Sequence, residues 1–283
     1  MIEINNGKLT AKFNELGAEL KSLVSNGKEY IWKGDEKFWA SSCPVLFPIC
    51  SGLIDNTYYI DGKKYEMNKH GFAKKSVFTV EDKKDDKVTF LLTDNEETLK
   101  QYPYHFEFRI TYTLICNKIE VKYDIKNTNG DEMYFSVGAH EGYSCVGGIE
   151  NYDIILPKKQ TLVNTVLTGP NTLGYEQFTV LENSDVFPIE YKHFAVDALV
   201  FQNVDFDNVI LKNRLDGTAL KITFKGFPYL LLWTKPDAPY ICIEPWCGIA
   251  DRDDGDQNFK TKQGIEHILP NGTFTRIHTI EVL

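Results

Sequence analysis

The chain has 283 residues, of which 42% are hydrophobic, so it is long enough to bury a sizeable core in one large domain or two smaller ones. Its 31 basic and 40 acidic residues give a formal charge of −9, which disfavours nucleic acid and anionic lipid surfaces as partners. We therefore expect no nucleic-acid partner. No apolar run approaches the ~20 residues that cross a bilayer, so we expect no membrane span either.

The N-terminus and the cysteines indicate a reducing compartment. The first seven residues lack the basic start and long apolar stretch of a secretory signal. The six cysteines include no C-x-x-C pair, which favours free thiols over a disulfide framework or a zinc site. We therefore expect a cytoplasmic protein.

The first half of the chain contains the clearest short-range signals. Segments rich in Val, Ile, Tyr, Phe and Thr recur about every ten residues between turn residues, which predicts strands. Residues 58–67 read as a hairpin, because Asp61 and Gly62 suit the two positive-φ positions of a type I′ turn. Residues 76–81 and 87–93 flank another turn and are expected to pair.

One short helix is expected over 95–101, with Asp94 as its cap. Beyond it, residues 119–126 are expected to pair with residues 133–138 across the turn at 127–130. Strands thus dominate the pattern, and helical periodicity is nearly absent.

Residues 134–140 form an expected strand with two different faces. Alternation places small and polar residues beside a histidine on one face, which leaves room for a ligand. The apolar face contains Phe135, Val137 and Ala139, and the other contains Tyr134, Ser136, Gly138 and His140.

Residues 240–248 form a second such strand. Ile241 and Ile243 are expected on one face, and Tyr240, Cys242 and Glu244 on the other. Because Pro245 cannot donate to a ladder, we expect pairing to stop there, leaving Glu244 at the end of a strand and facing a cleft.

A metal site is one interpretation of the thiols that border this acid, Cys242 and Cys247. No histidine lies near them in the sequence, so we interpret both as core thiols and expect no metal and no other cofactor.

The pattern as a whole predicts an all-β protein with few short helices. No linker, low-complexity tract or fixed-period repeat divides the chain, so we expect a single domain over residues 1–283. A single sheet of so many strands would twist and split, so two stacked sheets are expected.

Three polar residues have settings that favour chemistry: His70, His140 and Glu244, each beside glycine, proline or an aromatic. A lone histidine is more often a hydrogen-bonded structural residue, so the case depends on the three together. An aromatic ring can stack against the C–H face of a sugar. The rings that could do so here are Trp246, Phe72 and Tyr143.

These motifs occur in an order that resembles the galactose mutarotase superfamily, the aldose 1-epimerases, and within it the branch related to the LacX proteins. The likeness runs from end to end, although any single motif is weak. It is carried by Gly17-Ala18-Glu19-Leu20, Glu29-Tyr30-Ile31-Trp32, Trp39, Pro44-Val45-Leu46-Phe47-Pro48, His70-Gly71-Phe72-Ala73, Phe135 to His140, Asp197-Ala198-Leu199-Val200-Phe201, Leu232-Trp233-Thr234-Lys235-Pro236 and Glu244-Pro245-Trp246.

The resemblance implies a large antiparallel β-sandwich with a sugar cleft, the supersandwich of galactose mutarotases. It implies an enzyme that interconverts the α and β anomers of a free aldohexose without a cofactor, as a monomer or homodimer. It assigns His140 as general acid, Glu244 as general base, and His70 and Asp197 as substrate ligands. A nearby carboxylate would favour the protonated imidazole that such an acid requires.

Several alternatives stay open. The family usually has an arginine where this chain has Gly52, and Lys69 or Lys74 would have to fill that space. The chain could act on a hexose 6-phosphate, which needs a cationic site, or bind a sugar without turnover. A glycosidase would require a second acid such as Glu141, and Asp197 could simply cap a turn.

Overall fold

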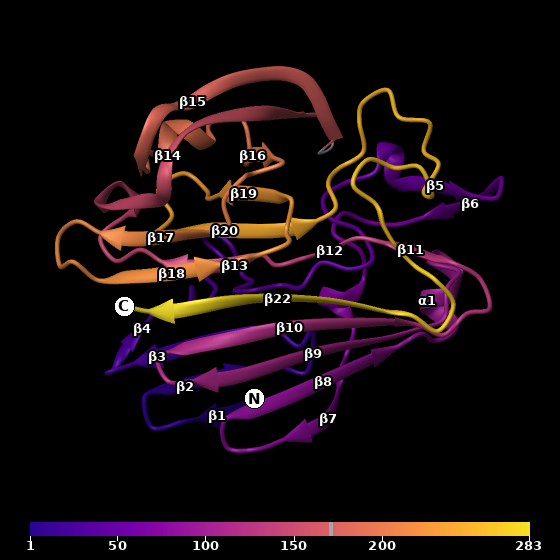
Figure 1. Cartoon of the computed structure of the whole chain (residues 1–283), viewed down its shortest axis with the longest axis horizontal. Helices are drawn as coiled ribbons and strands as arrows, with labels where there is room; N and C mark the ends of the chain where they lie inside the picture. The colour runs from indigo at the N-terminus through magenta and orange to yellow at the C-terminus, as the bar shows by residue number, and fades with distance from the viewer. Residues whose placement is uncertain (170–171) are drawn as a thin grey trace.

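The computed structural model describes residues 1–169 and 172–283, and the regular secondary structure of these residues is almost entirely antiparallel strands (Figure 1). The largest sheet has nine strands. In spatial order they are β15 (Thr172–Pro188), β14 (Tyr152–Thr168), β17 (Asn208–Asn213), β18 (Ala219–Thr223), β22 (Thr273–Val282), β10 (Lys118–Asn127), β9 (Phe106–Ile115), β8 (Lys87–Thr93) and β7 (Thr79–Lys83).

The other strands of the described residues form four smaller sheets. A five-stranded sheet contains β12 (Val137–Gly138), β13 (Glu141–Ser144), β20 (Tyr240–Cys247), β19 (Tyr229–Trp233) and β16 (Leu199–Gln202). A four-stranded sheet contains β1 (Ile2–Asn5), β2 (Leu9–Phe13), β3 (Leu20–Ser25) and β4 (Lys28–Glu29). The two-stranded sheets are β5 (Thr57–Ile60) with β6 (Lys63–Glu66), and β11 (Met133–Phe135) with β21 (Glu266–Ile268).

Helical structure is limited to short segments. Residues 1–169 and 172–283 contain one six-residue α-helix, α1 (Glu96–Gln101), and the 3-10 turns Ile54–Asn56, Ala73–Lys75, Ile149–Asn151 and Tyr191–Phe194. None of the described helices is both long and apolar enough to span a bilayer. The expectation of a β-sandwich with few short helices is confirmed.

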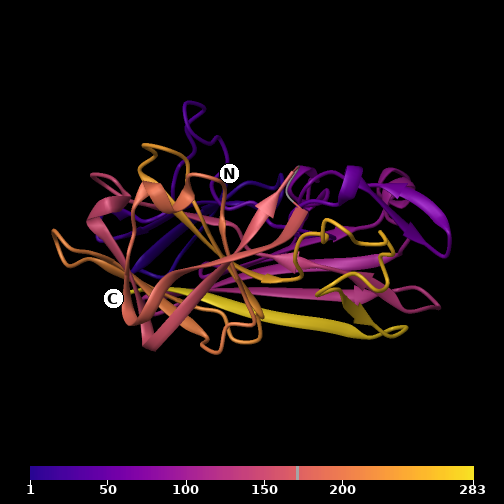
Figure 2. The ribbon, with the colours of Figure 1, turned by 90° about the horizontal axis from the view of Figure 1, so that it is seen from above.

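The central strands of the large sheet have one buried face and one partly exposed face. Along β9 and β10 buried and partly exposed residues alternate, with Phe108 and Ile110 inside and Arg109 outside. The N-terminal sheet covers the buried face of β9, where the rings of Phe13 and Tyr112 lie 4.4 Å apart. Figure 2 shows this second layer, in indigo, beside the large sheet, whose strand β22 is in yellow.

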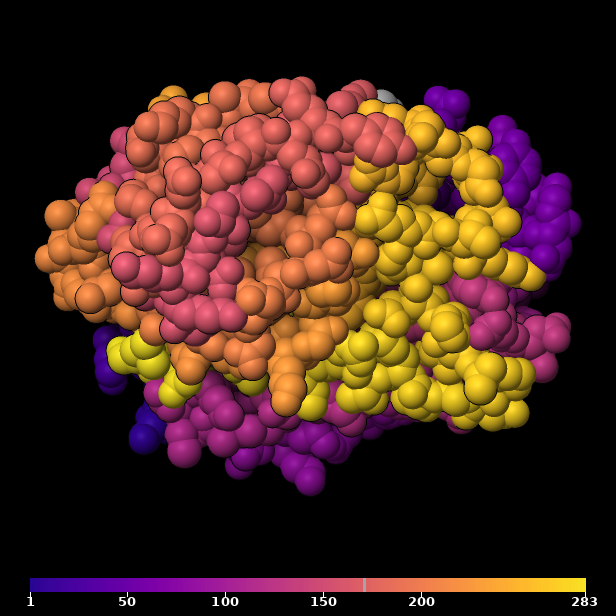
Figure 3. All heavy atoms as spheres, turned by 45° about the horizontal axis from the view of Figure 1, so that its top comes forward, coloured from indigo at the N-terminus to yellow at the C-terminus, as the bar shows by residue number. Residues whose placement is uncertain are grey.

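The β14–β15 pair arches over the five-stranded sheet (Figure 1). Both strands are 17 residues long, and their register shifts at several bulges. Figure 3 shows that this pair and the segment after β20 occupy neighbouring parts of one face of the molecule. Together with β16 and β19, they bring distant parts of the sequence to one side of β20.

Two local predictions are confirmed. The hairpin at β5 and β6 has its turn at Asp61 and Gly62, with φ of 51° and 77°. Strands β7 and β8 pair as expected.

Two other local predictions are wrong. The cap of α1 is Asn95, whose side chain accepts from the N–H groups of Glu97 and Thr98, while Asp94 instead accepts from the N–H of Phe106. Residues 119–126 lie in β10, which pairs with β9 and β22 and not with residues 133–138. Alternation fixes which face of a strand is buried, but it does not choose the partner strand.

Residues 134–140 do not form one strand. They divide between β11, which pairs with β21, and β12, which pairs with β20. A second interruption follows β12 and contains His140. It lies between β12 and β13, which pair with different parts of β20.

The expected stop at Pro245 is also wrong, because β20 continues to Cys247 and Glu244 lies inside the strand. The carbonyl of Pro245 accepts from the N–H of Ala139, in the gap between β12 and β13. The proline nitrogen faces the same gap, because the N and O of a strand residue point to the same side in an antiparallel ladder. Its missing N–H therefore costs no ladder bond.

Candidate active site

A cavity of about 280 Å³ lies beside β20 and contains five of the six predicted site residues. Its volume is close to the ~300 Å³ at which small-molecule pockets begin, a size suited to one monosaccharide. The lining residues are Trp39, Ser41, Pro44, Ser51, Lys69, His70, Lys74, His140, Leu167, Asp197, Ala198, Leu231, Trp233, Glu244 and Trp246.

Glu244 reaches this cavity because of its position in β20. The predicted alternation is correct, since Ile241 and Ile243 pack in the main core while Tyr240, Cys242 and Glu244 face the other side. The Glu244 side chain is only 2% exposed. A buried carboxyl group is thus held at the floor of the cavity.

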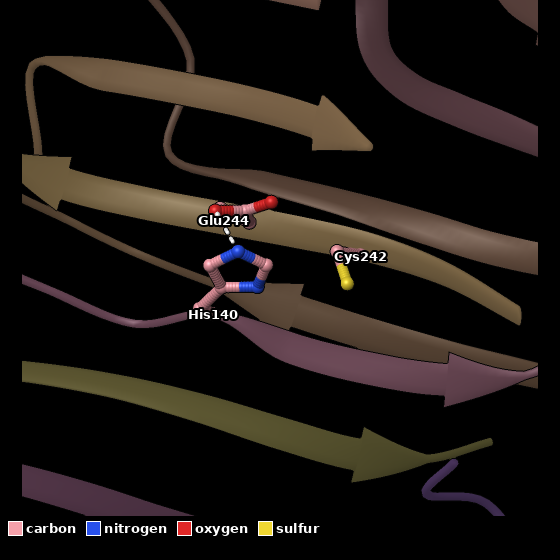
Figure 4. Close-up of side chains that lie close together, drawn as sticks. All are labelled: His140, Cys242 and Glu244. Carbon is pink, nitrogen blue, oxygen red and sulfur yellow. Dashed lines mark ion pairs between the residues drawn. The ribbon is translucent and has the colours of Figure 1, made fainter. Parts of the chain in front are cut away.

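His140 meets Glu244 across the pocket floor. Nε2 of His140 lies 3.4 Å from Oε2 of Glu244 (Figure 4). The imidazole is enclosed by aromatic rings, with Trp39 at 5.1 Å and Trp233 at 5.7 Å between ring centroids. The gap in the sheet that frees residue 140 from pairing therefore places it against the acid.

His70 is fixed by its own turn. Its backbone N–H donates to the carbonyl of Ser51 at 2.8 Å. His70 and Gly71 both have φ of 68°, and a Cβ on Gly71 would lie 2.2 Å from the carbonyl oxygen of Phe47. Only glycine fits there, so the segment His70-Gly71 is held tightly against the Phe47 backbone.

Trp246 forms part of the wall. Its Nε1 donates to the carbonyl of Ala139 at 3.0 Å, and its ring lies 5.7 Å from that of His70. A Cβ on Gly138 would lie 2.5 Å from Cδ1 of Trp246, so the ring can occupy this place only beside a glycine.

Asp197 lines the cavity at its rim, before β16. Its carboxylate also accepts from the N–H of Ala198 at 2.7 Å, so it caps the turn as well. No described residue donates a hydrogen bond to its other oxygen, Oδ2, and the part of Asp197 in sugar binding stays a prediction.

Two predicted aromatic contacts do not reach the cavity. Phe72 is 7% exposed and packs in the core against Phe47 and Phe106, so it does not offer a ring to a ligand there. Tyr143 is fully buried in the same core. Trp39 and Trp233 line the cavity instead, and although both occur in motifs that suggested the resemblance, sequence reasoning gave neither a role in the site.

The position of the usual arginine is filled differently. Gly52 does not line the cavity, and its carbonyl accepts from the N–H of Asp251. Lys69 and Lys74 both do line it, as one reading of the sequence required. Burial, followed by the charges of Lys75 and Lys69, lowers the pKa of Lys74 to about 8.

Comparison with known proteins identifies the family of the chain. The aldose 1-epimerase family profile matches residues 1–279. Protein LacX from the chromosome of Lactococcus lactis subsp. lactis is 31% identical over 297 residues, an alignment that covers all of this chain and 99% of LacX. The chain belongs to the aldose 1-epimerase family.

Solved structures show the same relationship. A galactose mutarotase related enzyme from Lactobacillus acidophilus superposes with a TM-score of 0.94 at 30% identity, covering all of this chain and 97% of that one. A galactose mutarotase-like protein from Lactobacillus casei also has a TM-score of 0.94, at 27% identity with full coverage of both chains. The galactose 1-epimerase of Lactobacillus acidophilus, at 12% identity and a TM-score of 0.75 over 99% of this chain and 92% of that one, shares the fold.

The electrostatics of this epimerase-family site differ from the expectation at His140. Burial, followed by the charges of Lys69 and Lys74, lowers the pKa of His140 to about 3. Burial also raises the pKa of Glu244 well above its usual value. Desolvation therefore outweighs the attraction between the partners, and burial favours a neutral imidazole beside a neutral carboxyl.

Glu141, the acid that a glycosidase would need, points away from the cavity. Its Oε1 lies 2.9 Å from Nε2 of His278 on β22, inside the core. Successive residues in an extended chain face opposite sides, so His140 and Glu141 cannot both serve one pocket. Glu141 therefore cannot be the second carboxylate of a glycosidase here, and the other carboxyl group in the lining of the cavity belongs to Asp197.

One expectation about the thiols also changes. Cys247 packs in the main core, as predicted. Cys242 is buried too, but its sulfur lies within 4.8 Å of ligand atoms of His140 and Glu244. The sequence argument excluded a metal site because no histidine is near Cys242 in the sequence. That criterion was wrong, because the fold brings His140 beside Cys242.

Proposed function

We propose that the protein is an aldose 1-epimerase that interconverts the α and β anomers of a free aldohexose. The observation that carries this proposal is the His140–Glu244 pair, 3.4 Å apart at the floor of a cavity of about 280 Å³. Ring opening requires one proton to leave the C1 hydroxyl and another to reach the ring oxygen. Both oxygens are bonded to C1, so an acid and a base that act on them must be neighbours.

The proposed reaction uses each group twice. Glu244 takes the proton from the C1 hydroxyl while His140 gives a proton to the ring oxygen, and the bond between C1 and that oxygen breaks to leave an aldehyde. Rotation about the C1–C2 bond presents the other face of the carbonyl. The ring oxygen then attacks C1, His140 recovers its proton and Glu244 returns the other. Each positioned proton transfer is typically worth ~10²–10⁴-fold.

The total proton count of the pair suits this cycle. A neutral imidazole with a neutral carboxyl holds two exchangeable protons, one N–H and one O–H, and an imidazolium with a carboxylate holds the same number, both as N–H. A sugar hydroxyl that donates to Glu244 favours the ionised carboxylate, because a hydrogen bond to the charged form lowers a pKa. Substrate binding thereby favours the arrangement in which His140 is the acid and Glu244 the base.

The remaining lining suits a polyhydroxylated ring. His70 and Asp197 offer a donor and an acceptor for hydroxyl groups, and Trp246, Trp39 and Trp233 offer ring faces. The 30%-identical enzyme from Lactobacillus acidophilus, described as galactose mutarotase related, supports galactose as the first sugar to test.

The direct test is polarimetry of freshly dissolved α-galactose and α-glucose with purified protein, followed by NMR exchange measurements over a panel of aldoses. We expect the approach to anomeric equilibrium to accelerate in proportion to protein concentration. An unchanged rate across the panel, with sugar binding detected by calorimetry, would instead identify a sugar-binding protein without turnover.

A second substrate class is favoured by one observation: two lysines, Lys69 and Lys74, line the cavity of a chain whose formal charge is −9. Their ammonium groups suit the phosphate of a hexose 6-phosphate. Comparing glucose with glucose 6-phosphate in the same assay separates the two substrates, since a phosphate that contacts a lysine lowers KM.

A further inference from the structure

We propose that His140, Cys242 and Glu244 form a binding site for a thiophilic divalent cation such as Zn²⁺, and that an ion held there stops turnover. The binding half of this inference stands on geometry alone. The inhibition half rests on the proposed function, because it requires His140 and Glu244 to be the acid–base pair.

The three side chains have the separation that a zinc ion needs. An imidazole nitrogen of His140, Sγ of Cys242 and a carboxylate oxygen of Glu244 all lie within 4.8 Å of one another. Zinc bonds of ~2.0–2.3 Å in a tetrahedron place ligand atoms ~3.3–3.6 Å apart. Nε2 of His140 and Oε2 of Glu244 are already 3.4 Å apart, so completing the set requires mainly an approach of the sulfur.

The arrangement in the fold makes that approach small. Glu244 and Cys242 project from the same face of β20, two residues apart, and the imidazole of His140 faces both of them (Figure 4). A rigid central strand therefore fixes two of the ligands, and a small rotation of side chains completes the set.

The Cys242 thiol is free to bind an ion. The described residues form no hydrogen bond with it, whereas Cys145 and Cys247 each donate to a backbone carbonyl at 3.7 Å. Buried polar atoms in native proteins normally have partners, and a bound ion would supply one for this sulfur.

The chemistry of this donor set is specific. Thiolate and imidazole ligands select zinc and similar ions over magnesium and calcium, which prefer oxygen. A thiolate and a carboxylate together balance the two charges of Zn²⁺. The Cys242 proton leaves as the ion enters, so binding releases protons and strengthens as pH rises. Three protein ligands leave a fourth position for water on the cavity side.

An ion at this place removes both catalytic groups at once. The lone pair of His140 and the carboxylate of Glu244 become metal ligands, so neither can exchange a proton with the sugar. We therefore expect zinc to inhibit by lowering kcat, and magnesium to have no effect at the same concentration.

The binding test uses the reduced, metal-free full chain and needs no catalytic activity. We expect titration with Co²⁺ to give one site per chain and a thiolate-to-cobalt absorption band, and Zn²⁺ to displace the cobalt. Cys242→Ser should lose the band and bind Zn²⁺ more weakly by over ~100-fold, beyond the usual ~10–100-fold cost of losing an outer-shell partner. The control is Cys247→Ser on the opposite face of the same strand, which should bind normally.

The outcomes separate this inference from the proposed function. The site is disproved if the wild-type chain shows no thiolate-to-cobalt band, a result that does not depend on any variant folding. Zinc affinity unchanged by Cys242→Ser also disproves it. Each variant's mutarotation rate is compared with its own rate without zinc, and we expect at least tenfold less inhibition in Cys242→Ser than in Cys247→Ser. A protein with the band but no mutarotase activity retains the metal site and loses only the proposed reaction.

Discussion

The backbone N–H of Ser51 donates to Nδ1 of His70 at 3.0 Å. The acceptor nitrogen carries no proton, so the neutral ring has its proton on Nε2. Burial, followed by the nearby His140, Lys74 and Lys69, lowers the pKa of His70 well below its usual value, which agrees with a neutral ring. His70 thus enters the cavity as a fixed hydrogen-bond donor.

His70→Asn tests that role. The asparagine oxygen takes the place of Nδ1 and keeps the bond from Ser51, while the Nε2 donor is lost. Asparagine also tolerates the positive φ at this position. We expect KM for the sugar to rise up to ~10-fold, as one hydrogen bond of ~0.5–1.5 kcal/mol predicts, with kcat and unfolding temperature nearly unchanged. A KM equal to that of the wild type would remove His70 from the substrate ligands.

Glu244→Gln should lower kcat/KM for mutarotation by ~10²–10⁴-fold, because the amide cannot accept the C1 hydroxyl proton. Near-ultraviolet circular dichroism should show an unchanged fold, since the two side chains are nearly identical in shape. Glu266→Gln on β21, outside the cavity, is the matched control and should keep full activity. If the Glu244 variant keeps wild-type activity, the base is another group.

His140 should make stability depend on pH in a defined window. Its pKa is about 3 in the folded protein, against ~6.5 for an unfolded histidine. Between these values the unfolded chain binds a proton that the folded protein refuses, so stability falls as pH drops from ~6.5 towards 3. His140→Asn removes that loss. Relative to wild type, the variant should gain up to ~1.4 kcal/mol of unfolding free energy per pH unit in this window.

Urea unfolding at pH 8, 5.5 and 4.5 measures this gain, with the exposed His267→Asn as the control. The free-energy difference between the His140 variant and wild type should be constant above pH 7 and grow below it. A difference that stays constant down to pH 4.5 would show that His140 is protonated normally in the folded protein.

Lys74→Gln tests whether the site takes a phosphorylated sugar. The pKa of Lys74 is lowered to about 8, so its ammonium group is mostly present at pH 7 and is lost above pH 8. If hexose 6-phosphate is the substrate, the variant should raise its KM by ~10–100-fold, the value of a hydrogen bond to a charged group. The exposed neighbour Lys75→Gln should have a much smaller effect. Equal KM values for glucose and glucose 6-phosphate in the wild type would exclude the phosphate role.

Gly138→Ala should disturb the cavity wall. The added Cβ would lie 2.5 Å from Trp246 and 3.0 Å from Sγ of Cys50, so one of them must move. We expect a loss of ~1–3 kcal/mol in unfolding free energy, typical of overpacking, together with a raised KM. Gly130→Ala is the matched control, because nothing lies within 4 Å of its Cβ. Equal effects of the two substitutions would mean that the glycine does not hold Trp246 in place.

Some features of the fold were readable in the sequence because their causes are local. The turn at Asp61 and Gly62 depends on two residues that accept positive φ, and the structure has that turn. Alternation along residues 240–244 correctly separated the core side from the cavity side. The ordered motifs pointed to the family, and five of the six residues chosen for the site line one cavity.

Other features were decided only by tertiary structure. Three of them depend on which strands become neighbours: the pairing of β10 with β22, the continuation of β20 through Pro245, and the burial of Phe72. The alternation of buried and exposed residues along a strand does not contain that information. The protonation of His140 was misjudged for the same reason. A carboxylate beside an imidazole favours charge, but the surrounding layers exclude water from both, and desolvation is a property of the whole fold.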